Sequence, residues 1–171
     1  MMRREKVISA VIWGLMMTLT VLQIALSILL YRQVGLGVLR NVGWVILWGA
    51  GFLGVAPIFT LRRKGGVSKG QSYIHTTILV DSGIYAVVRH PQYLSFMLLN
   101  TGLMLVAQHW LTTVLGVAAM GLDYLIALEA DREAIVKLGD DYTLYMARVP
   151  RVNFLIGLVR LLRRKARQVP P

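Results

Sequence analysis

The residues best suited to chemistry lie in one stretch, Leu79–Tyr93, which leads directly into an apolar run. Polar donors at the boundary of the apolar run come from Tyr85, Arg89, His90 and Tyr93. Gly83 permits a backbone turn, and Pro91 suits the first turn of a helix, where its missing N–H costs nothing. These residue types fit a binding site, and they fit equally well an anchor at the lipid headgroups, where Arg and Tyr are common.

Other familiar kinds of catalytic site are not indicated. The histidines have no acidic or thiol partners at ligand spacing, so we expect no metal site; they are His75, His90 and His109. No Ser or Thr has the setting of a nucleophile elbow. Residues 49–54 match the dinucleotide fingerprint GxGxxG, but they lie inside an apolar run rather than between a strand and a helix. Small residues there are expected to allow close helix packing.

The composition places these residues in a membrane protein. The chain has 171 residues, enough for one domain, and 56% of them are hydrophobic. A soluble domain of this size has too little interior for so much apolar material. The net charge of +11 arises from 19 basic against 8 acidic residues. Because the basic residues flank the apolar runs, we expect them to meet anionic headgroups rather than nucleic acid.

Four apolar runs predict the fold, since about 20 helical residues cross a hydrocarbon core. The runs are Val7–Tyr31, Gly43–Leu61, Tyr93–Val106 and Trp110–Leu128. The first is too long for a signal peptide and is expected to be retained. The third is short for a crossing, and it forms a tight helical hairpin with the fourth. We therefore predict a single all-α membrane domain with about four transmembrane helices.

The basic residues also predict the orientation. They concentrate at the N-terminus, in residues 62–91 and after Leu128, so we expect a multi-pass cell-membrane protein with both termini in the cytoplasm. Residues 152–167 mix apolar and basic side chains, which is typical of an amphipathic helix lying on the headgroups. Asp123 lies inside the fourth run. It is either functional or paired there, or close enough to the helix end to reach water or an arginine.

Two motifs resemble one known family. The pattern Gly-x-Tyr-x-x-x-Arg-His-Pro-x-Tyr at residues 83–93 resembles that of the isoprenylcysteine carboxyl methyltransferase and phospholipid N-methyltransferase family, in which it leads into a helical hairpin. After the hairpin come Gly139-Asp-Asp-Tyr142, Tyr145 and Val149-Pro-Arg151, in the family's order. The resemblance covers residues 77–151. It implies a membrane methyltransferase that uses S-adenosyl-L-methionine, with residues 1–64 as two N-terminal helices, 65–151 as the catalytic region and 152–171 as a basic tail.

The resemblance also implies which residues hold the cofactor. Carried over by position, they are Thr77, Ile78, Leu79, Val80, Tyr85, His90, Pro91, Gln92 and Tyr93. The family's acidic pair falls on Ala130 and Asp131, with Glu129 one place earlier, so Glu129 and Asp131 are both candidates. The arginine that holds the substrate carboxylate in the isoprenylcysteine branch falls on Ile126, which weakens the case for a prenylcysteine substrate.

Such an enzyme would methylate a hydrophobic or lipid-like acceptor. A carboxylate acceptor needs only a cation to guide it, for which Arg132, Arg148 and Arg151 are candidates. An amine must first lose a proton, and the candidate bases are Glu129, Asp131 and Glu133. On a helix Glu129 shares a side with Arg132 and Glu133. Among all of these, Glu129, Arg132 and Arg148 are the predicted catalytic residues; the plain alternative, favoured for Glu133, is a solvated charged face.

Two other functions remain open at this point. One is a membrane reductase of the sterol-reductase type that uses NADPH, because those proteins share the plan of a hairpin with a cytoplasmic pocket. The other is a non-enzymatic membrane scaffold whose basic tail binds anionic lipid. A scaffold would leave the Arg-His-Pro-Gln-Tyr cluster at residues 89–93 unexplained.

Overall fold

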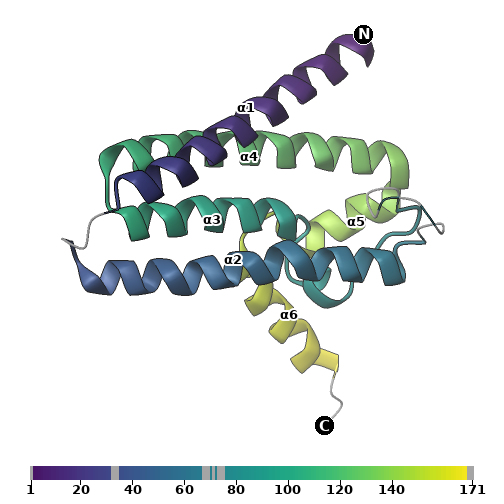
Figure 1. The fold of residues 1–171 in the computed structure, drawn as a ribbon. Coiled ribbons are helices and arrows are strands. Elements are labelled where there is room, and N and C mark those ends of the chain that lie inside the picture. Colours follow the sequence, from purple (N-terminus) through teal and green to yellow (C-terminus); the bar gives the residue numbers. More distant parts are fainter. Residues whose placement is uncertain (1, 32–34, 67–69, 71, 73–75, 169–171) are drawn as a thin grey trace. The chain divides into compact units, whose positions relative to one another are not determined.

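The computed structural model describes residues 2–31, 35–66, 70, 72 and 76–168, and all the regular secondary structure in them is helical (Figure 1). Side chains are described within these ranges from residue 7 to residue 166. The elements are α1 (Met2–Leu29), α2 (Gly37–Lys64), the short 3-10 turn η1 (Gly83–Ala86), α3 (Pro91–Ala107), α4 (Trp110–Leu138), α5 (Asp140–Arg148) and α6 (Phe154–Gln168). The predicted all-α class is confirmed for these residues.

Each predicted apolar run forms a helix. Within the described residues, three helices are long and apolar enough to cross a membrane: α1 from Val7 onward, α2 and α4. The helix α3 has 17 residues. A full crossing takes roughly 20 helical residues at 1.5 Å each, so α3 is short for a crossing. A multi-pass membrane protein is therefore supported, and the fourth crossing stays a prediction.

The predicted hairpin between α3 and α4 turns on two residues, Gln108 and His109. The φ of Gln108 is 47°, in the left-handed region that lets the chain reverse sharply. The backbone N–H of Leu111, one of the free donors at the start of α4, donates to His109 Nδ1 at 3.2 Å. The Gln108 amide exchanges two hydrogen bonds with the backbone of Leu36, at 2.9 and 3.0 Å. This turn is thereby tied to the start of α2.

The helix of the fourth apolar run does not end at Leu128, where the run was predicted to end, but continues into the charged residues after it. The two form one helix, α4, of 29 residues. Between residues 128 and 138 there is no Gly or Pro, and Leu, Ala, Glu, Arg and Lys all favour helix. The helix ends only at Gly139, whose φ of 62° is available to glycine at little cost.

The chain divides into two compact units, neither continuous in sequence. Unit 1 comprises residues 1–52 and 95–128, and unit 2 comprises residues 53–94 and 129–171. Unit 1 buries a group of polar side chains between its helices: Thr20, Gln23, Ser27, Asn100, Thr112 and Asp123. Asp123 is fully buried and accepts a hydrogen bond from Asn100 Nδ2 at 3.4 Å. Of the two alternatives for this residue, pairing inside the helix bundle is the one observed.

Gln23 joins three helices of unit 1. Its side chain is fully buried, and its Nε2 donates to the carbonyl oxygens of Asn100 in α3 and Thr112 in α4, each at 3.0 Å. Polar bonds of this kind hold membrane helices together where apolar burial gives no preference over lipid.

Glycines allow a close approach of α2 and α3 in unit 1. A Cβ on Gly43 would lie 2.9 Å from the Gly102 carbonyl oxygen, and one on Gly102 would lie 2.7 Å from Leu47. By contrast, a Cβ on Gly49 or Gly51 would meet nothing within 4 Å. The expectation that the small residues near position 50 mediate close packing is therefore wrong for these two, and the close contact lies two turns earlier along α2.

This contact predicts that Gly102→Leu destabilises unit 1. A leucine would force α2 and α3 apart, and overpacking of this kind costs about 1–3 kcal/mol. We expect a lower midpoint of thermal unfolding for detergent-solubilised protein, followed by circular dichroism. The matched control is Gly121→Leu, because nothing lies within 4 Å of a Cβ at that position. Equal midpoints for the two variants would contradict the packing described.

Candidate active site

A single carboxylate organises unit 2. Asp131, on the last turns of α4, is 3% exposed and accepts four hydrogen bonds. The donors are Arg89 Nη2 at 3.0 Å, His90 Nε2 at 2.7 Å, Tyr142 OH at 2.7 Å and Arg151 Nε at 2.6 Å. Hydrogen bonds to a charged acceptor are the stronger kind. Asp131 therefore joins α4 and α5 to the segment before α3 and the segment after α5.

The main chain connects the same segments. The backbone N–H of Arg89 donates to the carbonyl oxygen of Pro150 at 3.0 Å, and that of His90 donates to Arg151 at 3.1 Å. The Arg-His-Pro-x-Tyr motif thus pairs directly with the Val-Pro-Arg motif. Within unit 2 these two pieces of chain therefore lie side by side.

Two tyrosines of α5 extend this connection. Tyr145 OH donates to the carbonyl oxygen of Tyr85 in η1 at 2.6 Å. Both Tyr142 and Tyr145 are buried, and their ring centroids are 5.7 Å apart. Burial raises the pKa of both phenols above the ordinary tyrosine value, and the Asp131 carboxylate raises the pKa of Tyr142 further. Both hydroxyls therefore remain neutral donors over the working pH range.

A cavity of about 240 Å³ lies within unit 2 beside these residues. Eight of the residues predicted to hold the cofactor line it: Ile78, Leu79, Val80, Tyr85, His90, Pro91, Gln92 and Tyr93. The other eight were not among the predicted cofactor residues: Leu61, Thr76, Arg89, Ala130, Ala134, Leu138, Tyr142 and Tyr145. That the eight predicted residues bind the cofactor stays a prediction.

Three predicted cofactor residues do not line this cavity. Thr77 Oγ1 donates to the carbonyl oxygen of Gly66 at 3.1 Å, and the Thr77 backbone N–H donates to Gly65 at 2.9 Å, so this residue holds the chain after α2. Asp131 lies behind Arg89 and His90 as their acceptor. Glu129 pairs instead with Arg132 on the surface of α4, at 3.3 Å.

The three predicted catalytic residues lie outside the cavity lining. The side chains of Glu129 and Arg132 are 39% and 78% exposed, and isolated exposed pairs contribute little to stability. Arg148 Nη2 lies 4.0 Å from Asp81 Oδ2, and both of these side chains are also about half exposed. The structure thus brings Glu129 and Arg132 together, but it does not place either of them or Arg148 at the cavity.

Some lining residues carried a sequence signal. Tyr142 and Tyr145 belong to the Gly-Asp-Asp-Tyr-x-x-Tyr motif, and a spacing of three places them on one side of a helix. Ala130 and Ala134 are four residues apart on α4, which likewise puts them on one side. Small residues at that spacing leave room beside a helix.

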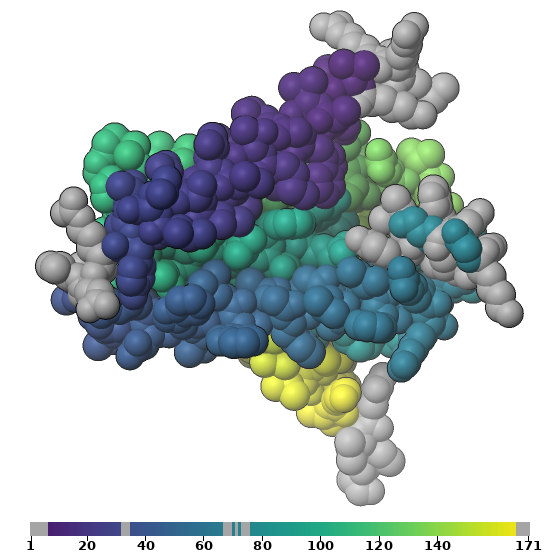
Figure 2. Space-filling model, in the orientation of Figure 1, coloured from purple at the N-terminus to yellow at the C-terminus, as the bar shows by residue number. Residues whose placement is uncertain are grey.

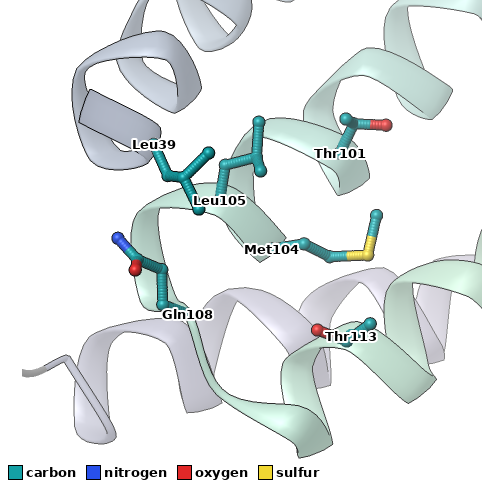
Figure 3. Close-up of a pocket in the computed structure, with 6 residues that line it drawn as sticks. All are labelled: Leu39, Thr101, Met104, Leu105, Gln108 and Thr113. Atoms are coloured by element: carbon teal, nitrogen blue, oxygen red, sulfur yellow. The ribbon is translucent and has the colours of Figure 1, made fainter. Parts of the chain in front are cut away.

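A second cavity, of about 350 Å³, lies within unit 1 near the α3–α4 turn (Figure 3). Its lining is Leu39, Thr101, Met104, Leu105, Gln108 and Thr113. Its polar groups are already bonded: Gln108 to Leu36, and the hydroxyls of Thr101 and Thr113 to the carbonyl oxygens of Met97 and His109. With no titratable side chain in its lining, this cavity has no group that could act as an acid or base.

Comparisons with known proteins agree with the motifs. The sequence model of the isoprenylcysteine carboxyl methyltransferase (ICMT) family matches residues 68–137. The chain is also similar to the Protein-S-isoprenylcysteine O-methyltransferase of Schizosaccharomyces pombe, with 29% identity over 99 residues, which cover 53% of this chain and 42% of that protein. No solved structure matches. The resemblance to this family is therefore confirmed, over a region that ends within α4, before the second motif.

Proposed function

We propose, from the match of residues 68–137 to the isoprenylcysteine carboxyl methyltransferase family, that this chain transfers a methyl group from S-adenosyl-L-methionine to a hydrophobic or lipid-like acceptor at the membrane surface. One observation carries the proposal. The two motifs, on either side of the α3–α4 hairpin in sequence, meet at Asp131 beside a cavity with eight of the predicted cofactor residues in its lining.

The cavity lining suits this cofactor chemically. Tyr142 and Tyr145 have their hydroxyls engaged and thus offer aromatic ring to the cavity, and aromatic faces attract cations such as a sulfonium. Arg89 Nε is buried without a partner among the described residues. A buried donor left unsatisfied is costly, and an acceptor oxygen of a bound ligand would relieve that cost. Leu79, Val80 and the other aliphatic side chains suit the apolar parts of the ligand.

The residues of unit 2 would act mainly by positioning. The cofactor supplies an electrophilic methyl group on a sulfonium, so the acceptor forms a bond to that carbon as the carbon–sulfur bond breaks. Alignment of two reactants can supply about 7–11 kcal/mol of the barrier. Asp131 fixes Arg89 and His90 from one side, and Tyr145 fixes the Tyr85 backbone from the other. The walls of the cavity are therefore held in place before the ligands bind.

The same contacts favour an acceptor that is already ionised, such as a lipid-linked carboxylate. Asp131 accepts four hydrogen bonds, and a carboxylate so stabilised is a poor base. Glu129 and Glu133 are absent from the cavity lining, and among the described lining residues there is no Asp or Glu. Two arginines, Arg89 and Arg151, surround the single charge of Asp131, which leaves a positive excess that would attract an anion.

The orientation of the protein in the membrane determines how each reactant would reach the cavity. The basic residues at the N-terminus, in residues 62–91 and after Leu128 favour an orientation in which both termini and this site face the cytoplasm. A lipid-like acceptor would then reach the cavity from the bilayer, and the water-soluble cofactor would reach it from the cytoplasm.

The direct test uses S-adenosyl-L-methionine labelled in its methyl group, incubated with reconstituted protein and a lipid extract. We expect label in an extracted lipid that mild base releases, because methyl esters are base-labile. A label resistant to base would redirect the proposal to an amine acceptor. No labelled lipid, with protein shown to be folded, would contradict methyl transfer to lipid-like acceptors in that extract.

A further inference from the structure

The C-terminal helix α6 presents an apolar face that the described residues do not cover. The apolar side chains along it are partly or largely exposed: Phe154 37%, Leu155 74%, Leu158 36%, Val159 47% and Leu162 57%. At 100° per residue these five positions fall within one broad stripe of the helix. Arg163 lies at one edge of the stripe, Arg160 lies on the opposite side of the helix, and both are exposed. Figure 2 shows α6 as a ridge, in yellow, that protrudes from the surface.

The opposite edge of α6 is fixed to the candidate active site. Gly157 is buried, and a Cβ there would overlap the carbonyl oxygen of Val87. About two turns further on, Arg164 Nη2 donates to the carbonyl oxygen of Ala86 at 3.1 Å. Ala86 ends η1, the turn that also contains Tyr85 of the cavity lining. The apolar stripe therefore points away from the contact with η1.

The charge of α6 and its neighbour in unit 2 indicate what covers the stripe. Within unit 2, α6 slants away from the C-terminal part of α2 (Figure 1), and α2 is long and apolar enough to cross a membrane. A helix that combines an exposed apolar stripe with several basic residues binds at the boundary between headgroups and acyl chains, and more strongly where lipids are anionic.

We propose that α6 binds an anionic lipid surface and holds the η1 turn of the cavity at that surface. The apolar stripe enters the acyl boundary, and Arg163 at its edge contacts anionic headgroups. On the other side of the helix, Gly157 and Arg164 hold the η1 turn. This inference does not depend on methyl transfer, since it rests only on the contacts and exposure of α6.

The test uses nitroxide labels on engineered cysteines, which are the sole labelling sites because the chain has no cysteine. Full-length Leu155→Cys, Leu162→Cys and Arg160→Cys are each reconstituted in phosphatidylcholine, with and without phosphatidylglycerol. Collision with oxygen and with a water-soluble nickel chelate measures label depth. We expect the labels at 155 and 162 to lose nickel accessibility when phosphatidylglycerol is present, and the label at 160 to stay accessible.

Three results would overturn parts of the proposal. If the labels at 155 and 162 remain as nickel-accessible as the label at 160 in both membranes, α6 does not bind the surface. If they are equally protected with and without phosphatidylglycerol, the anionic preference is wrong. The docking to η1 is tested by adding Gly157→Val to the Leu155→Cys protein, which should make the label at 155 more mobile. The control is Gly14→Val, where a Cβ meets nothing within 4 Å and the mobility should not change. Equal mobility of the label in these two variants would exclude the docking to η1.

Discussion

Asp131→Asn is expected to cause the largest loss of stability of any single polar substitution in unit 2. An asparagine of the same shape removes the charge between Arg89 and Arg151 and directs N–H groups at side chains that are themselves donors. Breaking a buried ion pair by removing one partner costs about 3–5 kcal/mol. We expect a lower midpoint of thermal unfolding and loss of cofactor binding, measured on detergent-solubilised protein by circular dichroism and by calorimetry.

The control for this variant lies two residues away on the same helix. Glu129→Gln breaks an ion pair that is exposed to solvent, for which about 0–1 kcal/mol is expected. The comparison separates a general effect of removing an acidic residue from α4 from the specific role of Asp131. Similar unfolding midpoints for the two variants would show that Asp131 does not organise unit 2.

Ala134→Trp is expected to have the largest effect on ligand binding without loss of the fold. Ala134 lines the cavity from α4 and is only partly buried, so an indole has room to enter the cavity. By occupying space that the ligand needs, it should weaken binding of S-adenosylhomocysteine at least a hundredfold, which corresponds to about 2.7 kcal/mol. Isothermal calorimetry measures the affinity, and circular dichroism checks that the helices persist.

The neighbouring residue provides the matched control. Glu133→Trp places the same side chain on the exposed surface of the same helix, and we expect its affinity for S-adenosylhomocysteine to equal that of the unaltered protein. Unchanged affinity in Ala134→Trp would place the binding site elsewhere.

The sequence predicted the helices well because their signals are local. Each apolar run became a helix, and the turn at residues 108–109 formed where only three residues separate two runs. The exact ends of the helices were harder to predict from the sequence. The apolar and charged parts of α4 look different in composition, yet helix propensity continues through both and ends only at Gly139, where φ is positive.

For the candidate site, the sequence indicated the residue types but not the partners. Arg89 and Asp131 are 42 positions apart, and no local pattern relates them. Which of Glu129 and Asp131 faces the site depends on helix phase, because side chains two positions apart point about 200° apart around a helix. Once Asp131 faces the interior, Glu129 must face outward, and this phase is fixed by tertiary packing rather than by the residues of α4 alone.

The central claim is that the cavity of unit 2 binds S-adenosyl-L-methionine, and titration calorimetry of the unaltered, detergent-solubilised protein tests it most directly. Saturable binding of S-adenosylhomocysteine with one site per chain, and no binding of NADPH, is the result expected. Uptake of NADPH alone would instead support a reductase, and uptake of neither ligand by folded protein would contradict the account.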